Sequence, residues 1–332
     1  MNTMKGPSPE KVMQLISGGW AAAILGAAAK HGVFNALEKG ADDAAGVAKK
    51  TGISARGAQA VLDGLTGLGL LLLSGGRYAN SPESAQFLVK GKPSYLGGMA
   101  EVMTASLVDW STLPEAVKIG APTGSATAAV PDNEFWKILV PAIATMSFPV
   151  AQMAAEKLGL SKAGPVRWLD VGGGSGVWSA VFLGANKEAK GVQLDWPGVN
   201  KIAKDFVGGF GVGDRFSTID GDFHTTDFGT GYDYAIYAHI AHQEAPADNV
   251  AIFKKFRKAL KPGGTLLVND FVLADDRTGH PFAMMFSSQM LLVSKGGAAW
   301  RQADYRKWLT EAGFSSIELM PTPGPATVVF AR

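Results

Sequence analysis

Apolar and polar positions alternate at two different spacings along the chain. Up to about residue 160, stretches such as "GGWAAAILGAAAKHGVFNAL" (18–37) repeat apolar residues at the spacing of a helix. From about residue 164, short apolar runs bounded by turn residues alternate with helical stretches. We therefore expect a mainly helical N-terminal part followed by an α/β part.

The first part contains a pattern typical of a winged helix. Within residues 42–81 the sequence predicts a short helix, a turn at Thr51 and Gly52, and a second helix capped by Ser54. A hairpin is expected around Gly75. This order of elements is most often that of a DNA-binding regulator.

The charges of the second helix argue against DNA as its partner. The stretch "SARGAQAVLDGLTGLG" (54–69) carries only Arg56, Gln59 and the acidic Asp63, whereas a recognition helix needs donors facing the groove. The net charge of the chain is +2, which gives no reason to expect a nucleic acid or a membrane surface as a partner. We expect this part to pack against another protein chain.

The second part repeats strand and helix units, which predicts a doubly wound parallel sheet. Its end, "IELMPTPGPATVVFAR" (317–332), predicts a hairpin that forms an antiparallel edge. The expected strands cover residues 166–171, 189–195, 216–221, 232–238 and 264–273, and the expected helices include 176–185, 199–208 and 247–260.

Four glycines follow the first of these strands, in "WLDVGGGSGVW" (168–178). The turn after the first strand of such a sheet lines its ligand site. A nicotinamide dinucleotide site needs Gly-x-Gly-x-x-Gly or Ala. Counted from Gly172 the third position is Val177, and counted from Gly174 it is Ser179, so neither frame fits a nicotinamide-dependent oxidoreductase.

The pattern Asp-x-Gly-x-Gly-x-Gly does fit, at Asp170, Gly172, Gly174 and Gly176. Pyrophosphate prefers bare amides and the positive end of a helix. A carboxylate just before the turn instead suits a ligand that carries an ammonium group. The motif therefore points to an amino-acid-bearing nucleoside such as S-adenosylmethionine.

Acidic and aromatic residues at the next two strand ends complete this site. Asp195 is placed to accept hydrogen bonds from two ribose hydroxyls, and Trp196 beside it to pack on the adenine. Asp222 is placed to accept from the adenine amino group, and Phe223 to stack on the ring. Each acid alone is typical of a turn, but three at successive strand ends favour a cofactor site.

These motifs resemble a known family. "RWLDVGGGSG", "GVQLDWP", "DGDF" and "FRKALKPGGTLLVNDFVL" are similar to class I S-adenosylmethionine-dependent methyltransferases. With "HGVFNAL" and "GGRYANSPES" in the first part, the chain resembles the small-molecule O-methyltransferases related to plant caffeate and animal acetylserotonin methyltransferases and to bacterial tailoring enzymes. The resemblance runs from about residue 10 to the end.

The resemblance implies a Rossmann-like sheet of seven strands in the order three, two, one, four, five, seven, six. It implies an N-terminal winged-helix-like dimerisation domain over residues 1–100, a helical linker over 101–160 that contributes to the active site, and a cofactor-binding catalytic domain over 161–332. Two protomers are expected to interlock as a homodimer, each lending N-terminal residues to the active site of the other.

The resemblance also identifies a catalytic base. "YAHIAHQEAP" (237–246) places His242 at the family's histidine, which takes the proton of a hydroxyl acceptor. Of the two acids that commonly orient it, the first maps to Asp270, and the second maps to Ala299. Many relatives follow the histidine with aspartate, where this chain has Gln243.

The loss of one orienting acid keeps several acceptors open, because it lowers the basicity of the histidine. The expected acceptor is a hydroxyl of a small aromatic or hydroxylated metabolite. The alternative is a thioether or thiol sulfur, which needs only proximity and desolvation. Carbon and nitrogen acceptors, and a relative that binds the cofactor as a scaffold without catalysis, also stay open.

Several residues map to positions that face the acceptor in the family, although methionine and aromatic rows at such spacing also build cores. Residues 281–297 predict a helix that covers the acceptor. The expected substrate contacts are Trp136, Met146, Phe148, His239, Met285, Met290 and Ser294.

Composition excludes further chemistry. The chain has no cysteine, which removes disulfides and thiol nucleophiles. No metal is expected, because His239 and His242 lack an obvious carboxylate neighbour in the sequence. The start "MNTMKGPSPE" carries no secretory pattern and the apolar runs are too short to span a bilayer, so we expect a cytoplasmic protein.

Overall fold

The computed structural model describes residues 7–124 and 134–332 of the chain. The chain forms two compact units. The first consists of Met1–Val108 with Pro141–Thr145, and the second of Asp109–Val140 with Met146–Arg332.

The first unit contains the predicted winged helix. Asp43 and Ser54 cap its two helices, since their side chains accept from the backbone N–H groups of Gly46 and Gly57 at 2.8 and 3.0 Å. The helix between them ends at Gly52, whose φ is +74°. The elements are α1 (Glu10–Ile16), α2 (Gly18–Lys30), α3 (Val33–Ala36), α4 (Ala44–Thr51), α5 (Ala55–Gly67), β1 (Leu71–Ser74), β2 (Arg77–Asn80), α6 (Pro82–Phe87) and α7 (Gly97–Ala105).

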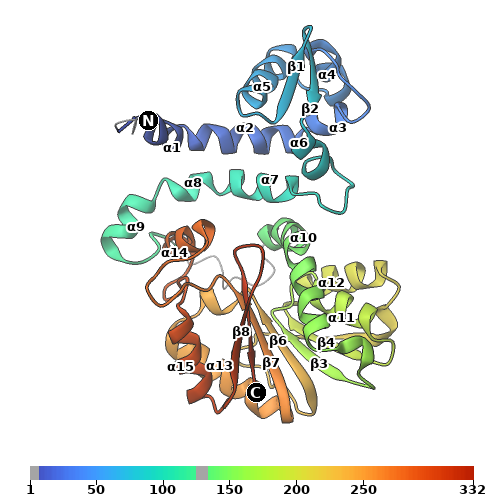
Figure 1. Cartoon of the computed structure of the whole chain (residues 1–332), viewed down its shortest axis with the longest axis vertical. Helices are drawn as coiled ribbons and strands as arrows, with labels where there is room; N and C mark the ends of the chain where they lie inside the picture. The colour runs from blue at the N-terminus through green and yellow to red at the C-terminus, as the bar shows by residue number, and fades with distance from the viewer. Residues whose placement is uncertain (1–6, 125–133) are drawn as a thin grey trace, which may run out of the picture. The chain divides into compact units, whose positions relative to one another are not determined.

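Helices α2 and α7 lie close together in this unit (Figure 1). A Cβ added at Gly26 would come within 3 Å of Thr104, whose hydroxyl donates to the carbonyl of Ala22 at 2.9 Å. Glycine at position 26 therefore sets how closely the two helices approach. The buried core of the unit includes Phe34 and Leu62.

The second unit holds the α/β part. After α8 (Leu107–Trp110), which spans the boundary between the units in the sequence, come α9 (Leu113–Ile119), α10 (Glu134–Lys157), η2 (Leu160–Lys162), β3 (Arg167–Val171), α11 (Val177–Ala185), β4 (Lys190–Asp195), α12 (Pro197–Gly209), η3 (Gly213–Arg215), β5 (Phe216–Asp220), β6 (Tyr232–Ala238), η4 (Ala241–Gln243), α13 (Pro246–Ala259), β7 (Leu260–Asp270), α14 (Pro281–Val293), α15 (Gln302–Glu311), β8 (Ile317–Pro321) and β9 (Thr327–Ala331).

The seven strands form one sheet in the order β5-β4-β3-β6-β7-β9-β8. This order confirms the expected one, and β9 runs antiparallel to both β7 and β8, as the terminal hairpin predicts. Helices α11 and α12 cover one face of the sheet, and α13 and α15 cover the other (Figure 1). Because β3, β4, β6 and β7 run parallel to one another, their carboxyl ends meet along one edge of the sheet, where the predicted site lies.

The strand β7 starts earlier than the sequence predicts, at Leu260 instead of Gly264. Its pairing with β6 shifts register between Tyr232 and Tyr234. Gly263 sits at φ +77° in the displaced stretch, which accommodates the irregularity. Around the sheet lies a core that includes the fully buried rings of Phe253 and Phe256.

Within the described ranges, no single helix is both long enough and apolar enough to cross a membrane. Among the described helices, one pair, α1 and α2 taken together, meets the length and composition required, and the two are bent by 48° at their junction.

Candidate active site

The turn after β3 needs glycine at three positions. Gly172, Gly174 and Gly176 have φ values of +65°, +59° and +73°, the left-handed region that other residues rarely adopt. A Cβ at Gly172 would lie 2.8 Å from the side chain of Ile240, and one at Gly176 would lie 2.8 Å from Val207. The turn therefore packs tightly against its neighbours on two sides.

Around Gly174 the turn is held by the next strand. Its N–H donates to Asp195 Oδ2 at 3.0 Å, and its carbonyl accepts from Gln193 Nε2 at 3.1 Å. Gln193 also donates to Asn200, whose amide in turn donates to the carbonyl of Asp195. The sequence interpretation missed Gln193 and Asn200. The signal in the sequence was the amide Gln193 within the apolar run of the strand.

Asp170 lies at the end of β3 and is fully buried. Neither of its carboxylate oxygens has a hydrogen-bond partner among the described residues. Burial, with a smaller effect from Asp195, raises its pKa well above the usual value. A buried carboxylate without donors is costly, so this site fits a ligand that brings a cation or hydrogen-bond donors.

At the end of β4, Asp195 is also buried, but it accepts from the N–H groups of Gly174 and Trp196. Burial raises its pKa to about 6, although these two hydrogen bonds oppose the shift. Trp196 is half-buried at the start of α12. The buried acids and the glycine turn fit the amino acid and ribose groups of S-adenosylmethionine.

The loop after β5 carries the other two predicted cofactor residues. Asp222 accepts from the N–H of His224 at 2.8 Å, and the ring of Phe223 packs edge-on against Tyr237. Lys255 of α13 donates to the carbonyls of Phe223 and His224, which fixes this loop against the sheet.

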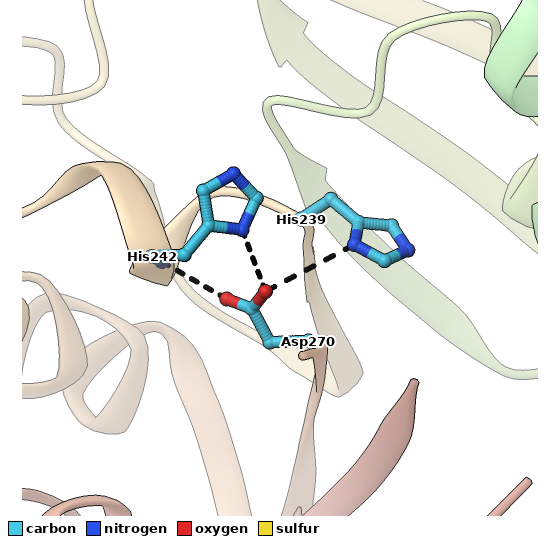
Figure 2. A group of neighbouring side chains, drawn as sticks. All are labelled: His239, His242 and Asp270. Atoms are coloured by element: carbon cyan, nitrogen blue, oxygen red, sulfur yellow. Dashed lines mark hydrogen bonds and ion pairs between the residues drawn. The ribbon is translucent and has the colours of Figure 1, made fainter. Parts of the chain in front are cut away.

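His242 and Asp270 form the closest pair of titratable side chains at this edge. His242 Nδ1 lies 2.6 Å from Asp270 Oδ1, and the backbone N–H of His242 donates to Oδ2 at 2.9 Å. Figure 2 shows one carboxylate oxygen of Asp270 facing the imidazole of His242 and the other facing the backbone N–H of the same histidine. Burial alone would raise the pKa of Asp270. The charge and hydrogen bond of His242, with smaller effects from His239 and the backbone N–H of Phe271, together lower that pKa below its usual value.

His239, immediately after β6, approaches the same carboxylate. Its Nδ1 lies 3.9 Å from Asp270 Oδ1 and has no hydrogen bond in the described structure, and its Nε2 lies 3.0 Å from the amide of Asn269. Burial lowers its pKa to about 4, which leaves it uncharged at neutral pH. Its φ is +58°, unusual for a residue other than glycine.

The sequence argument that His239 and His242 have no carboxylate neighbour is wrong, whereas the Asp270–His242 pair that the family resemblance implied is present. Both approach Asp270, and one atom from each of the three side chains lies within 4.8 Å of the others (Figure 2). The sequence separates Asp270 from His242 by 28 positions, but the pairing of β6 with β7 brings the two strand ends together.

Aromatic rings surround His242. Its ring centroid lies 4.7 Å from that of Phe286 and 5.9 Å from that of Phe271, which also contacts Phe282. Ala299, at the position of the second family acid, is buried in the same apolar cluster. The sequence interpretation did not assign these phenylalanines to the site.

The predicted residues of α14 take different positions. Met285 is 62% exposed and Met290 is buried. Ser294 ends the helix, where its hydroxyl donates to the carbonyl of Gln243 at 2.6 Å and accepts from the N–H of Gly297. The hydroxyl of Ser294 therefore fixes the segment that follows His242.

The other three predicted substrate residues lie on α10. Trp136 and Met146 are half-buried on this helix. The ring of Phe148 stacks on that of Phe210, with centroids 5.9 Å apart, where α12 ends.

Comparisons with known proteins agree with this geometry. Residues 110–315 match the O-methyltransferase domain, and residues 13–90 match the O-methyltransferase dimerisation domain. The chain is 32% identical to 3-hydroxy-5-methyl-1-naphthoate 3-O-methyltransferase of Streptomyces sahachiroi, over 97% of this chain and 94% of that protein.

Two further similarities cover the whole length. Tetracenomycin polyketide synthesis 8-O-methyl transferase of Streptomyces glaucescens is 28% identical over 98% of this chain and 96% of its own. The structure of human N-acetylserotonin methyltransferase in complex with S-adenosylmethionine has the same fold, with a TM-score of 0.86 at 24% identity over 100% of this chain and 99% of that one. The chain therefore belongs to the family of S-adenosylmethionine-dependent O-methyltransferases.

Proposed function

We propose that the protein transfers the methyl group of S-adenosylmethionine to a hydroxyl of a small aromatic metabolite, with His242 as the base. The observation that carries this proposal is the 2.6 Å contact between His242 Nδ1 and the buried carboxylate of Asp270. An ionised carboxylate accepts hydrogen bonds only, so it favours the tautomer with the proton on Nδ1. The lone pair then lies on Nε2, on the side of the ring away from Asp270.

The cofactor supplies an electrophilic methyl group on a sulfonium when it is bound. The chain's own residues would bind and orient it at the edge of the sheet. Asp170 would hold the ammonium group, and Asp195 the ribose hydroxyls. The glycine turn would follow its backbone closely, and Trp196 and Phe223 would enclose the adenine. The carboxylate of Asp170 supports this assignment, since none of the described residues donates a hydrogen bond to it.

An aromatic acceptor suits the surroundings of His242. The rings of Phe271 and Phe286 pack against the imidazole, and the side chain of His242 is buried. Two relatives are named as O-methyltransferases, one of a hydroxynaphthoate and one of tetracenomycin polyketide synthesis. The comparisons give no support to the sulfur acceptor that the sequence left open.

We also infer that the active protein is a homodimer with interlocked N-terminal parts. The match of residues 13–90 to the dimerisation domain supports the dimer. Each protomer would lend N-terminal residues to the acceptor side of the other's active site.

The test is a methylation assay with S-adenosylmethionine and four acceptors: a hydroxynaphthoate, a simple phenol, a catechol and thiophenol. Products are identified by mass spectrometry. Methyl ether formation on at least one hydroxyl is expected, and His242→Ala should lower kcat by roughly 10²-fold or more without weakening binding of S-adenosylhomocysteine. His31→Ala, at an exposed histidine of the first unit, is the matched control. Undiminished turnover in His242→Ala would rule out its role as the base.

A further inference from the structure

We propose that Tyr305 is a positioning residue for this reaction, holding the Asp270 carboxylate in place for His242. The inference rests on the proposed role of His242. Tyr305 lies on α15, 35 positions after Asp270, and its hydroxyl donates to Asp270 Oδ2 at 3.0 Å. Its side chain is fully buried.

The hydroxyl of Tyr305 completes the hydrogen bonding of the carboxylate. Oδ1 accepts from the backbone N–H of Phe271 at 2.8 Å and contacts His242 Nδ1 at 2.6 Å. Oδ2 accepts from the backbone N–H of His242 at 2.9 Å and from Tyr305. A carboxylate has about four acceptor positions, so all of them are used. Because Asp270 is fully buried, water cannot replace a lost donor.

Tyr305 is a permanent donor in this network. Burial, together with the charge of Asp270 and the hydrogen bond to it, raises the pKa of Tyr305 well above its usual value. The phenol therefore keeps its proton at neutral pH and well above it. Trp308, one turn further along α15, packs edge-on against its ring with centroids 5.7 Å apart and fixes its direction.

The sequence around position 299 explains why this chain depends on Tyr305. Ala299 supplies no carboxylate and lies in an apolar cluster with Phe271 and Phe286. No polar side chain at that position can orient the imidazole. Among the described contacts, the only side chains that hydrogen-bond to Asp270 are those of His242 and Tyr305. The orientation of His242 through Asp270 thus depends on Tyr305 and two backbone N–H groups.

The chain offers a matched control for this hydroxyl. Tyr237 of β6 is also fully buried, but its hydroxyl has no hydrogen-bond partner within the described residues. The change Tyr237→Phe therefore removes the same group from a similar environment without touching the carboxylate. Tyr305→Phe keeps the ring in both shape and packing, so both variants are expected to fold.

The first readout needs no acceptor. The protein is labelled with ¹⁵N-histidine, and the ring signals of His242 are assigned by their loss in His242→Ala. In Tyr305→Phe the Nδ1 proton should shift and exchange with solvent about tenfold faster, since one hydrogen bond to a charged group is lost. Tyr237→Phe should retain the wild-type signals. Identical His242 signals in the wild type, Tyr305→Phe and Tyr237→Phe would overturn the proposal.

The second readout is kinetic and uses the acceptor found in the methylation assay. Tyr305→Phe should lower kcat about tenfold with an unchanged KM for S-adenosylmethionine, and Tyr237→Phe should lower neither. In an Asp270→Ala background, Tyr305→Phe should cost nothing further, because the group it positions is gone. A second tenfold loss there would show that Tyr305 acts on something other than Asp270. If no acceptor is methylated, the proposed function fails, while the histidine spectra still decide the role of Tyr305.

Discussion

At the scale of single residues, the proposed site for a charged ligand requires two carboxyl groups to be buried, which disfavours their charged forms. Asp170 and Asp195 are buried, and burial raises the pKa of both, that of Asp195 to about 6. A folded-state pKa above the unfolded value means that the protein binds these protons more tightly when folded. The contribution of Asp195 to stability is therefore fully present below the unfolded pKa of about 4 and is lost as pH rises through about 6. That of Asp170 is lost as pH rises through its own raised pKa.

Binding of S-adenosylhomocysteine should reverse this linkage and release protons. The ammonium and ribose hydroxyls of the ligand favour the charged carboxylates, so the affinity should rise between about pH 5 and 7, by up to about tenfold per pH unit for each proton released. Calorimetric titrations in buffers of different ionisation enthalpy measure the number of protons. Asp195→Asn should remove the component centred near pH 6. Affinity that is independent of pH, or proton uptake, would contradict the proposed roles of these acids.

At the scale of elements, the glycine turn joins β3 to α11 while α12 packs against it. A Cβ at Gly176 would meet Val207 at 2.8 Å and Ala203 at 3.3 Å, both on α12, and the φ of +73° disfavours any side chain. Packing and backbone conformation therefore both require glycine at this position.

Gly176→Ala should destabilise the protein by about 2 kcal/mol, combining left-handed backbone strain with overpacking. It should also weaken cofactor binding, because the turn must shift. Gly184→Ala is the matched control, since Gly184 lies in α11 with no atom near its Cβ position. That control should be neutral or stabilising by up to about 1 kcal/mol. Thermal unfolding with and without S-adenosylhomocysteine measures both, and equal effects of the two changes would contradict the argument.

The elements also show where prediction from the sequence succeeds and where it stops. Asp170 and Asp195 were predictable because acids at the carboxyl ends of parallel strands share one edge of the sheet. The contact of Asp270 with His242 followed only from a family resemblance, since no spacing reveals it. Tyr305 was beyond reach, because its contact with Asp270 depends on how α15 packs against β7.

At the scale of the whole molecule, the first unit exposes an apolar surface. Helix α1 has no buried residue, and Leu15, Ile16 and Trp20 are 73%, 69% and 76% exposed. Surfaces of this kind on a folded protein mark interaction sites. They lie within or next to the segment that matches the dimerisation domain, so we assign them to the proposed homodimer.

Leu15→Asp should separate the dimer without unfolding the protomer. In a two-fold symmetric dimer each substitution counts twice, and exposing one leucine costs roughly 1.5–3 kcal/mol. Self-association should therefore weaken by about 10²-fold or more. Gln14→Asp, on the same exposed helix, adds the same charge without removing an apolar side chain and should remain dimeric. Size-exclusion chromatography with light scattering decides between the two.

The separated protomer also tests the shared active site. All predicted cofactor residues lie between Asp170 and Phe223 of one chain, so Leu15→Asp should bind S-adenosylhomocysteine with wild-type affinity. Turnover of the acceptor should fall, because N-terminal residues of the other protomer would no longer reach it. A monomer with full turnover would show that each chain carries a complete site. A Leu15→Asp protein that stays dimeric would place the interface elsewhere.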